Sequence, residues 1–584
     1  MNNFGYSSEK NIQILLAVLK TNNVKKIIAS PGTTNADFVG SVQSDPWFEV
    51  YSSVDERSAA YIACGMAAES GEAVVLSCTG ATASRDYYPG MTEAFYRKLP
   101  ILAVTSHRGQ DRIGHLLPQQ IDRTQIPHDI ARLSVELPRV RDARDEEYVV
   151  NEANRAVLEL FRDGGGPVHI NLIAPAGADF SVRELPEVRT VKRYFAWDNL
   201  PDLPNGRIAI FLGSSCIFSD RQKKAIERFC ATYDALVICD HSSGYYGKYR
   251  LLPTLAHFQE HPSKPIGKLD LMIHIGGVSA ATFAGTFETK EIWRVCEDGE
   301  PRNPYKKLTR VFQMPEWFFF EQYGRNGENK HAFIDEMKEA YSRLYARIPE
   351  LPFSNIWSAQ QLSSRIPKDA IFQISVSNTR RSWNMFPMPE GVTSGCNVGC
   401  CGIDGCTSTL VGASLVSPDK LHFLVTGDLA FFYDLNVLGN RHIGRNVRIL
   451  LVNNGVGAEF RIYTHYCYKF GEDTEKYIAA GGHNGHRSPQ LVKHIAEDLG
   501  FQYLSANDKE EYMKAFPVFV NPKMTDKPMI FEIFTTPGDE SDALKLMRTL
   551  NTDAGAILQS NIKEGIKSAL GKEGIKFVKN ILGK

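Results

Sequence analysis

The chain has 584 residues, of which 43% are hydrophobic and 23% charged, and its formal net charge is −1 at pH 7. This composition is typical of a globular protein with about three to four domains, and the near-zero charge argues against nucleic acid as its main partner. No run of about 18 apolar residues occurs, so we expect no membrane-spanning helix.

The first predicted element is a helix at residues 12–19. This stretch is apolar but short, and it follows acidic and polar residues, so we interpret it as an amphipathic helix and not as a signal peptide. The chain also has eleven cysteines without a regular framework spacing, which indicates free thiols in a reducing compartment. We therefore expect a cytoplasmic protein.

Strand-like and helix-like segments then alternate, which predicts the α/β class with three doubly wound, mostly parallel sheets. The first domain is predicted at residues 1–185, with strands at 25–29, 73–78, 101–105 and 167–172. A proline-rich passage at 200–204 lies early in a middle domain, residues 190–345, with strands at 208–212, 235–239 and 269–275. A second proline-containing linker precedes the third domain, residues 355–545, with strands at 370–374, 421–426, 447–452 and 529–534.

A glutamate stands at a strand-to-helix junction of the first domain, in the segment Val54-Asp55-Glu56-Arg57. A carboxylate beside an aromatic amine in a dry pocket can share a proton with a ring nitrogen, which would make Glu56 a catalytic residue of a thiamine diphosphate site. The simpler interpretation is an N-terminal helix cap with a favourable dipole position.

Two neighbouring strands of the third domain end in Gly427-Asp428 and Asn453-Asn454. Ligands bind at the carboxyl ends of parallel strands, so we expect Asp428 and Asn454 to lie side by side. One carboxylate, one amide oxygen and a backbone carbonyl, that of Val456, suit Mg²⁺ bound to a diphosphate. Gly427 would let the backbone approach the phosphates. Gly427-Asp428 or Asn453-Asn454 alone is most often a turn. Their occurrence together with Glu56 favours the interpretation that they form the two halves of one cofactor site.

Four cysteines surround a glycine-rich loop, Gly402-Ile403-Asp404-Gly405, at positions 396, 400, 401 and 406. They invite a zinc or iron–sulfur interpretation, but they contain no C-x2-C pair. We expect them to act as small hydrophobic residues beneath a cofactor.

The predicted C-terminal element, residues 553–584, repeats apolar residues at roughly helical spacing and carries six lysines between positions 561 and 584. A basic amphipathic helix can make peripheral contact with an anionic membrane. The alternative is a helix packed on its own protein or on a partner subunit.

Ordered motifs up to about residue 545 resemble the thiamine diphosphate-dependent decarboxylase and carboligase superfamily. The closest pattern is that of the 2-succinyl-5-enolpyruvyl-6-hydroxy-3-cyclohexene-1-carboxylate synthases of the menaquinone pathway. The matching motifs are Ser30-Pro31-Gly32, Asp55-Glu56-Arg57-Ser58-Ala59, Tyr88-Pro89 with Glu93-Ala94, Gly166-Pro167-Val168-His169-Ile170-Asn171, Gly402-Ile403-Asp404-Gly405, Gly427-Asp428-Leu429, Asp434-Leu435-Asn436 and Asn453-Asn454.

The resemblance implies a pyrimidine-binding, a middle and a diphosphate-binding domain, and a homodimer or homotetramer. It implies that Glu56 activates thiamine diphosphate, that Ile403 supports the bent cofactor, and that magnesium is held by Asp428, Asn454 and the Val456 carbonyl. The full set of implied cofactor-binding residues is Glu56, Ile403, Gly427, Asp428, Leu429, Asn454 and Val456. Whether the middle domain holds a flavin, as in some relatives, stays open.

The substrate positions depart from the family pattern. Thr33-Thr34 stands where the family has Ser-Arg, and Val398 replaces an arginine before the glycine-rich loop. Two lost charge-assisted contacts, each worth about 1.5–3 kcal/mol, disfavour 2-oxoglutarate and isochorismate, the substrates that the resemblance implies. Our substrate candidates are Thr33, Thr34, Arg108, Gln119, Ser377 and Arg381.

Two of these candidates, Arg108 and Arg381, have a simpler interpretation. Arg381 can pair bidentately with a substrate carboxylate, but a structural ion pair is an equal alternative. Further polar groups that could replace the lost contacts, or be structural instead, are His107, Arg108, Glu459 and Arg461.

We therefore expect an enzyme that uses thiamine diphosphate and Mg²⁺ to decarboxylate a 2-oxo acid and transfer the acyl anion equivalent to a small-molecule acceptor. The alternatives are a simple decarboxylase that releases an aldehyde, a genuine menaquinone-pathway synthase, and a catalytically silent homologue.

Overall fold

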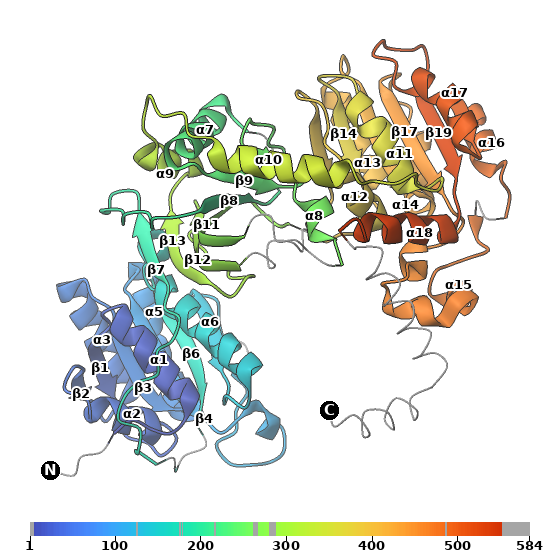
Figure 1. The fold of residues 1–584 in the computed structure, drawn as a ribbon. Helices are drawn as coiled ribbons and strands as arrows, with labels where there is room; N and C mark the ends of the chain where they lie inside the picture. The colour runs from blue at the N-terminus through green and yellow to red at the C-terminus, as the bar shows by residue number, and fades with distance from the viewer. Residues whose placement is uncertain are drawn as a thin grey trace, which may run out of the picture. The chain divides into compact units, whose positions relative to one another are not determined.

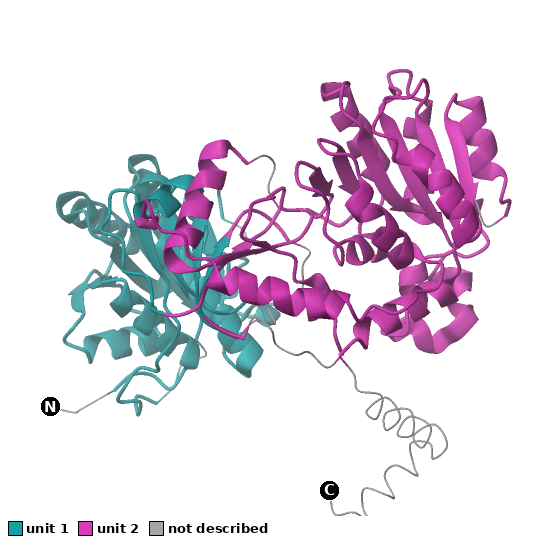
Figure 2. Ribbon diagram, turned by 45° about the horizontal axis from the view of Figure 1, so that its top comes forward, with its two compact units in different colours: residues 1–205, 270–274, 289–322 teal, residues 206–269, 275–288, 323–584 magenta. Residues whose placement is uncertain are grey.

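The computed structural model describes residues 5–123, 126–174, 177, 179–214, 218–260, 267–279, 288–484 and 487–551. These residues form an α/β structure with three sheets (Figure 1), which confirms the predicted fold class. The chain divides into unit 1, residues 1–205, 270–274 and 289–322, and unit 2, residues 206–269, 275–288 and 323–584 (Figure 2). The helix predicted at 553–584 lies outside the described residues. Within the described ranges, no helix is long and apolar enough to cross a bilayer.

The first sheet belongs to unit 1 and has six parallel strands in the order β2-β1-β3-β4-β6-β5. The strands are β1 (Lys26–Ala29), β2 (Glu49–Ser52), β3 (Val74–Thr79), β4 (Ile101–His107), β5 (Leu133–Leu137) and β6 (Val168–Ile173). The helices around it are α1 (Lys10–Thr21), α2 (Ala36–Gln43), α3 (Glu56–Ser70), α4 (Thr82–Asp86), α5 (Tyr88–Arg97) and α6 (Ala143–Glu159), with short 3-10 turns η1 (Gln110–Arg112) and η2 (Arg162–Gly164).

Both faces of this sheet are covered by helices. Successive side chains of a strand point to opposite faces, so Ile27 packs in a core with α1, α2 and α6, whereas Ile28 packs in a second core with α3 and α5. The predicted N-terminal helix is confirmed as α1, and most of its residues are buried. The continuous apolar strands therefore reflect burial on two sides, as in other parallel sheets.

The second sheet has seven strands in the order β10-β9-β8-β11-β12-β13-β7. The pairs β10–β9, β9–β8, β12–β13 and β13–β7 are parallel. The strands are β7 (Lys192–Phe195), β8 (Ile208–Leu212), β9 (Leu236–Cys239), β10 (Arg250–Leu251), β11 (Lys268–Ile275), β12 (Glu288–Cys296) and β13 (Leu308–Gln313), and the helices of this part of the chain are α7 (Asp220–Tyr233), α8 (Thr254–His257), α9 (Glu316–Tyr323) and α10 (Ala332–Tyr345).

The third sheet belongs to unit 2 and has six parallel strands in the order β15-β14-β16-β17-β19-β18. The strands are β14 (Ile371–Ile374), β15 (Thr393–Cys396), β16 (His422–Gly427), β17 (Val447–Asn453), β18 (Gln502–Ala506) and β19 (Met529–Phe534). The helices are α11 (Asn355–Leu362), α12 (Asn378–Trp383), α13 (Cys406–Val416), α14 (Asp428–Tyr433), α15 (Thr474–Tyr477), α16 (Leu491–Asp498), α17 (Lys509–Phe519) and α18 (Pro537–Arg548), with 3-10 segments η4 (Ser363–Arg365), η5 (Leu435–Gly439), η6 (Ala458–Arg461) and η7 (Tyr466–Asp473).

This sheet is also packed on both faces. Leu424 and Ile449 lie in a core with residues of α13 and α16. On the other face, the ring of Phe423 lies 5.5 Å from that of Phe519, and Tyr512 of α17 lies 5.1 Å from Phe531. Packing on both faces leaves the carboxyl edge of the sheet, where β16 and β17 end, as the place for a ligand.

Candidate active site

Asp428 lies at the carboxyl end of β16, beside the end of β17. The two strands are parallel, and Gly427 is level with Val452, so the register places Asp428 next to the Asn453-Asn454 segment. The adjacency expected from the order of the strands is therefore observed.

The Asp428 carboxylate is buried and accepts hydrogen bonds from backbone groups. The Leu429 N–H donates to Oδ1 at 2.8 Å, and the Gly455 N–H donates to Oδ2 at 2.6 Å. The residue is only 5% exposed, and burial raises the pKa of its carboxyl to about 6. A buried carboxylate with only backbone donors around it is suited to bind a cation, because a cation would offset the cost of its desolvation.

A pocket of about 210 Å³ surrounds this carboxylate, and we call it the unit 2 pocket. It gathers the cofactor-binding residues that the sequence predicts in the third domain: Ile403, Gly427, Asp428, Leu429, Asn454 and Val456. A Cβ added at Gly427 would meet no atom within 4 Å, so the backbone is open to a ligand there. The donor set, one carboxylate with amide and carbonyl oxygens beside an open glycine, fits Mg²⁺ and a diphosphate.

Two predicted substrate residues lie at or beside the unit 2 pocket. Ser377 lines it and has a left-handed φ of 60°, a conformation that is rare for serine and is often found at functional sites. Arg381 Nη2 donates to Glu459 Oε1 at 2.5 Å, and Glu459 lines the pocket. In this structure Arg381 therefore forms the ion pair that was its alternative interpretation.

A buried carboxylate behind the pocket was not predicted from the sequence. Glu540 of α18 accepts hydrogen bonds from the Asn355 N–H at 2.9 Å, the Thr535 hydroxyl at 2.9 Å and Asn378 Nδ2 at 3.2 Å. Asn355 and Asn378 line the pocket, and burial raises the pKa of Glu540 to about 7. Its position near the start of a helix gave no sign of this, because acidic residues there are usually exposed.

In unit 1, Glu56 is the first residue of α3, and the helix cap is its neighbour. The Asp55 carboxylate accepts hydrogen bonds from the Arg57 N–H at 3.1 Å and from the Ser58 hydroxyl at 2.6 Å. Glu56 is half-buried. Burial above all, with the Glu56 charge among the smaller causes, raises the pKa of Cys78. Asp55 is therefore the cap, and Glu56 has the favourable dipole position in the first turn of α3 that the simpler interpretation expects.

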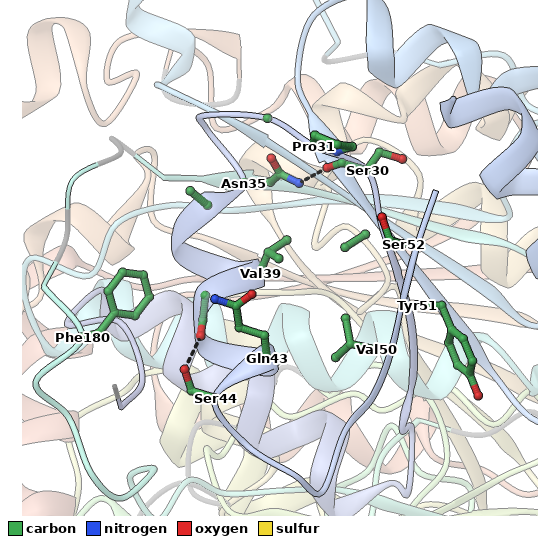
Figure 3. Close-up of a pocket in the computed structure, with 14 residues that line it drawn as sticks. Ser30, Pro31, Asn35, Val39, Gln43, Ser44, Val50, Tyr51, Ser52 and Phe180 are labelled. Carbon is green, nitrogen blue, oxygen red and sulfur yellow. Dashed lines mark hydrogen bonds between the residues drawn. The ribbon is translucent and has the colours of Figure 1, made fainter. Parts of the chain in front are cut away.

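A separate pocket of about 580 Å³ lies in unit 1 where β1 and β2 end and α2 begins (Figure 3). Ser30, Pro31 and Gly32 of a predicted motif line it, and Asn35 Nδ2 donates to the Ser30 carbonyl at 2.9 Å. Figure 3 shows Gln43 and Ser44 on the same wall, and Phe180 at the side. The described lining has no charged side chain.

The remaining substrate candidates of unit 1 are not gathered in one pocket. Thr33, Arg108 and Gln119 are exposed, whereas Thr34 is buried and its hydroxyl donates to the Ser106 carbonyl at 2.8 Å. His107 is buried, and mainly this burial lowers its pKa to about 3, so it is neutral near pH 7.

The residues around the glycine-rich loop differ in how exposed they are to solvent. Val398 and Cys406 are buried, and Cys406 lies in the core of the third sheet, but Cys400 and Cys401 are exposed. The prediction that these cysteines act as small buried hydrophobes is therefore wrong for Cys400 and Cys401, because the loop that carries them lies at the surface. Arg461, another candidate, forms an ion pair with Glu475.

The chain is similar to known proteins along most of its length. The profile described as "Thiamine pyrophosphate enzyme, N-terminal TPP binding domain" matches residues 10–126. The 2-succinyl-5-enolpyruvyl-6-hydroxy-3-cyclohexene-1-carboxylate synthase of Bacteroides fragilis is 30% identical, covering 92% of this chain and 98% of its own length. The synthase of the same name from Flavobacterium psychrophilum is 26% identical, covering 90% and 95%.

A solved structure was also matched, the thiamine diphosphate-dependent 4-hydroxybenzoylformate decarboxylase of Rhodococcus jostii RHA1. It is 15% identical, covers 90% of this chain and 99% of its own, and has a TM-score of 0.39.

Proposed function

The chain belongs to the family of thiamine pyrophosphate enzymes that includes the 2-succinyl-5-enolpyruvyl-6-hydroxy-3-cyclohexene-1-carboxylate synthases, and on that premise we propose its reaction. It decarboxylates a 2-oxo acid with the help of thiamine diphosphate and Mg²⁺, and it transfers the acyl anion equivalent to an acceptor. The observation that carries this proposal is the unit 2 pocket, where Asp428, Asn454 and Val456 lie together.

Six residues that line the unit 2 pocket have a role in the proposal. Asp428, the Asn454 amide oxygen and the Val456 carbonyl would hold Mg²⁺, and the backbone of Gly427 and Leu429 would adjoin the diphosphate. Ile403 would support the cofactor from the glycine-rich loop. When bound, thiamine diphosphate supplies the nucleophilic carbon and the electron sink for the decarboxylation.

Glu56, a residue of unit 1, is the proposed catalytic residue. Its carboxylate would share a proton with a ring nitrogen of the bound aminopyrimidine and so set the protonation state that the reaction needs. The support is its half-buried position and its freedom from the capping role, which Asp55 takes. We also propose a homodimer or homotetramer, the assembly that the resemblance implies.

The substrates are proposed to differ from those of the synthases. Thr34 uses its hydroxyl on the Ser106 carbonyl, and Val398 is buried and apolar, so neither supplies the positive charge of the arginine it replaces. This favours a 2-oxo acid and an acceptor other than 2-oxoglutarate and isochorismate.

The experiment measures CO2 release from a panel of 2-oxo acids with thiamine diphosphate and Mg²⁺, with and without acceptor aldehydes or enoates. We expect release that depends on Glu56 and Asp428 and that an acceptor stimulates. Aldehyde formation without acceptor stimulation would show that the enzyme is a simple decarboxylase. Highest activity with 2-oxoglutarate and isochorismate would show that it is a menaquinone-pathway synthase. Cofactor binding without release from any donor would contradict the proposal.

A further inference from the structure

The charged side chains that line the unit 2 pocket are all acidic. Its described lining contains two charged side chains, Asp428 and Glu459, and both are carboxylates. No lysine, arginine or histidine is among the described lining residues. Because the proposed function assigns Asp428 to the metal, Glu459 is the charged group that remains for a substrate.

The cation beside this pocket is already neutralised. Arg381 Nη2 and Glu459 Oε1 lie 2.5 Å apart, and the two side chains are only 19% and 29% exposed. The Arg381 backbone N–H donates to the Ser377 carbonyl at 3.1 Å, which is the first hydrogen bond of α12 and places Arg381 one turn after Ser377 of the pocket lining. An ion pair that is partly shielded from water keeps its geometry, so Arg381 does not offer its charge to a second anion.

The other oxygen of Glu459 still needs a donor. Oε2 is buried and has no hydrogen-bond partner among the described residues. A buried carboxylate oxygen without a donor is costly, and a second carboxylate brought beside it would add like-charge repulsion. The next residue, Phe460, presents a ring to the same pocket. The local chemistry therefore suits a neutral substrate group and not an anionic one.

We propose that Glu459 is a specificity-determining residue, which makes the enzyme select 2-oxo acids that lack a second carboxylate. This inference rests on the proposed function and deepens it by naming the class of donor. Glu459 disfavours dicarboxylic 2-oxo acids because it neutralises Arg381, which could otherwise bind their second carboxylate.

The test measures binding of pyruvate and of 2-oxoglutarate to the full chain, loaded with Mg²⁺ and an unreactive analogue of thiamine diphosphate. The variant is Glu459→Gln, which keeps the shape and removes the charge. The matched control is Glu475→Gln, because Glu475 forms an ion pair with Arg461, with exposures of 31% and 20%, and does not line the pocket. CO2 release from both donors is measured in parallel.

We expect the native protein to bind pyruvate at least about tenfold more tightly than 2-oxoglutarate, and Glu459→Gln to reduce this ratio by about tenfold. Glu475→Gln should leave the ratio unchanged. A native preference for 2-oxoglutarate, or a ratio that Glu459→Gln does not move, would overturn the inference.

The two proposals fail in different ways. The expected binding ratios without CO2 release from either donor would leave the selectivity of Glu459 supported and count against the proposed reaction. CO2 release from both donors at ratios that do not depend on Glu459 would support the reaction and overturn the inference. Failure of the cofactor analogue to bind would overturn both.

Discussion

The two units place their predicted site residues differently. In unit 2, residues from the glycine-rich loop and from the ends of β16 and β17 lie in one pocket. In unit 1, Thr33, Arg108 and Gln119 are exposed, and the buried Thr34 donates its hydroxyl to the Ser106 backbone carbonyl. The register of a parallel sheet brings strand ends together, whereas loop residues have no such constraint. Motifs at strand ends are therefore the better guides to a site.

The largest effect is expected from Asp428→Asn. Loss of the only carboxylate in the proposed metal site should lower kcat/KM at least about 1,000-fold and weaken Mg²⁺ binding. Asp434→Asn is the control, because the Asp434 carboxylate binds Ser408 and not the pocket. Steady-state kinetics and a Mg²⁺ titration measure both. Equal losses in the two variants would mean that Asp428 is only structural.

Glu56→Gln tests unit 1 in the same way. Loss of the proton-sharing carboxylate should lower kcat by about 100-fold or more while cofactor binding persists. The neighbouring change Asp55→Ala should instead reduce the free energy of unfolding by about 1 kcal/mol, through the lost cap, and keep most of the activity. Kinetics and urea unfolding separate the two residues. If Asp55→Ala were the more damaging to kcat, Glu56 would lose its role.

Glu540→Gln should change how stability depends on pH. The folded protein holds the pKa of Glu540 at about 7, above the ordinary 4.5. Between pH 4.5 and pH 7, Glu540 is therefore protonated in the folded state and ionised in the unfolded state. The free energy of unfolding should therefore fall as the pH rises from about 4.5 to 7, by up to about 3 kcal/mol from this group, and level off above that. Urea unfolding across this range should show a shallower decline in the variant. The same slope in both proteins would contradict the assignment.

The smallest effect is expected at Cys400, on the exposed loop of unit 2. Cys400→Ser should change the free energy of unfolding by less than about 0.5 kcal/mol. Cys406→Ser places a hydroxyl in the core of the third sheet and should cost about 1–3 kcal/mol. Thermal unfolding of the two variants measures this difference. A large loss at Cys400 would mean that the loop is buried in the functional protein.

Much of the fold could be predicted from the sequence. Strands such as residues 73–78 and 447–452 are long apolar runs, because parallel strands are buried on both faces. The edge strand β2 was expected before the helix of Glu56 but was given no bounds, since its residues are all exposed and carry no such pattern. The domain limits stay predictions, because the proline-rich linkers alone do not fix them.

The site was predicted in part, because only the residues that follow strands can be placed next to one another from the order of the chain. Asp428 and Asn454 follow strands, so their adjacency could be inferred, but the partner of Arg381 could not, since Glu459 lies 78 residues away in a 3-10 segment. Glu540 was missed because its three donors come from separate segments of the chain.

The most direct test of the central proposal is a crystal structure of the chain with Mn²⁺ and thiamine diphosphate, in which anomalous scattering locates the metal. We predict a metal peak bound by the Asp428 carboxylate, the Asn454 amide oxygen and the Val456 carbonyl, with the diphosphate beside Gly427. A metal and diphosphate bound elsewhere, with the unit 2 pocket empty, would contradict the account.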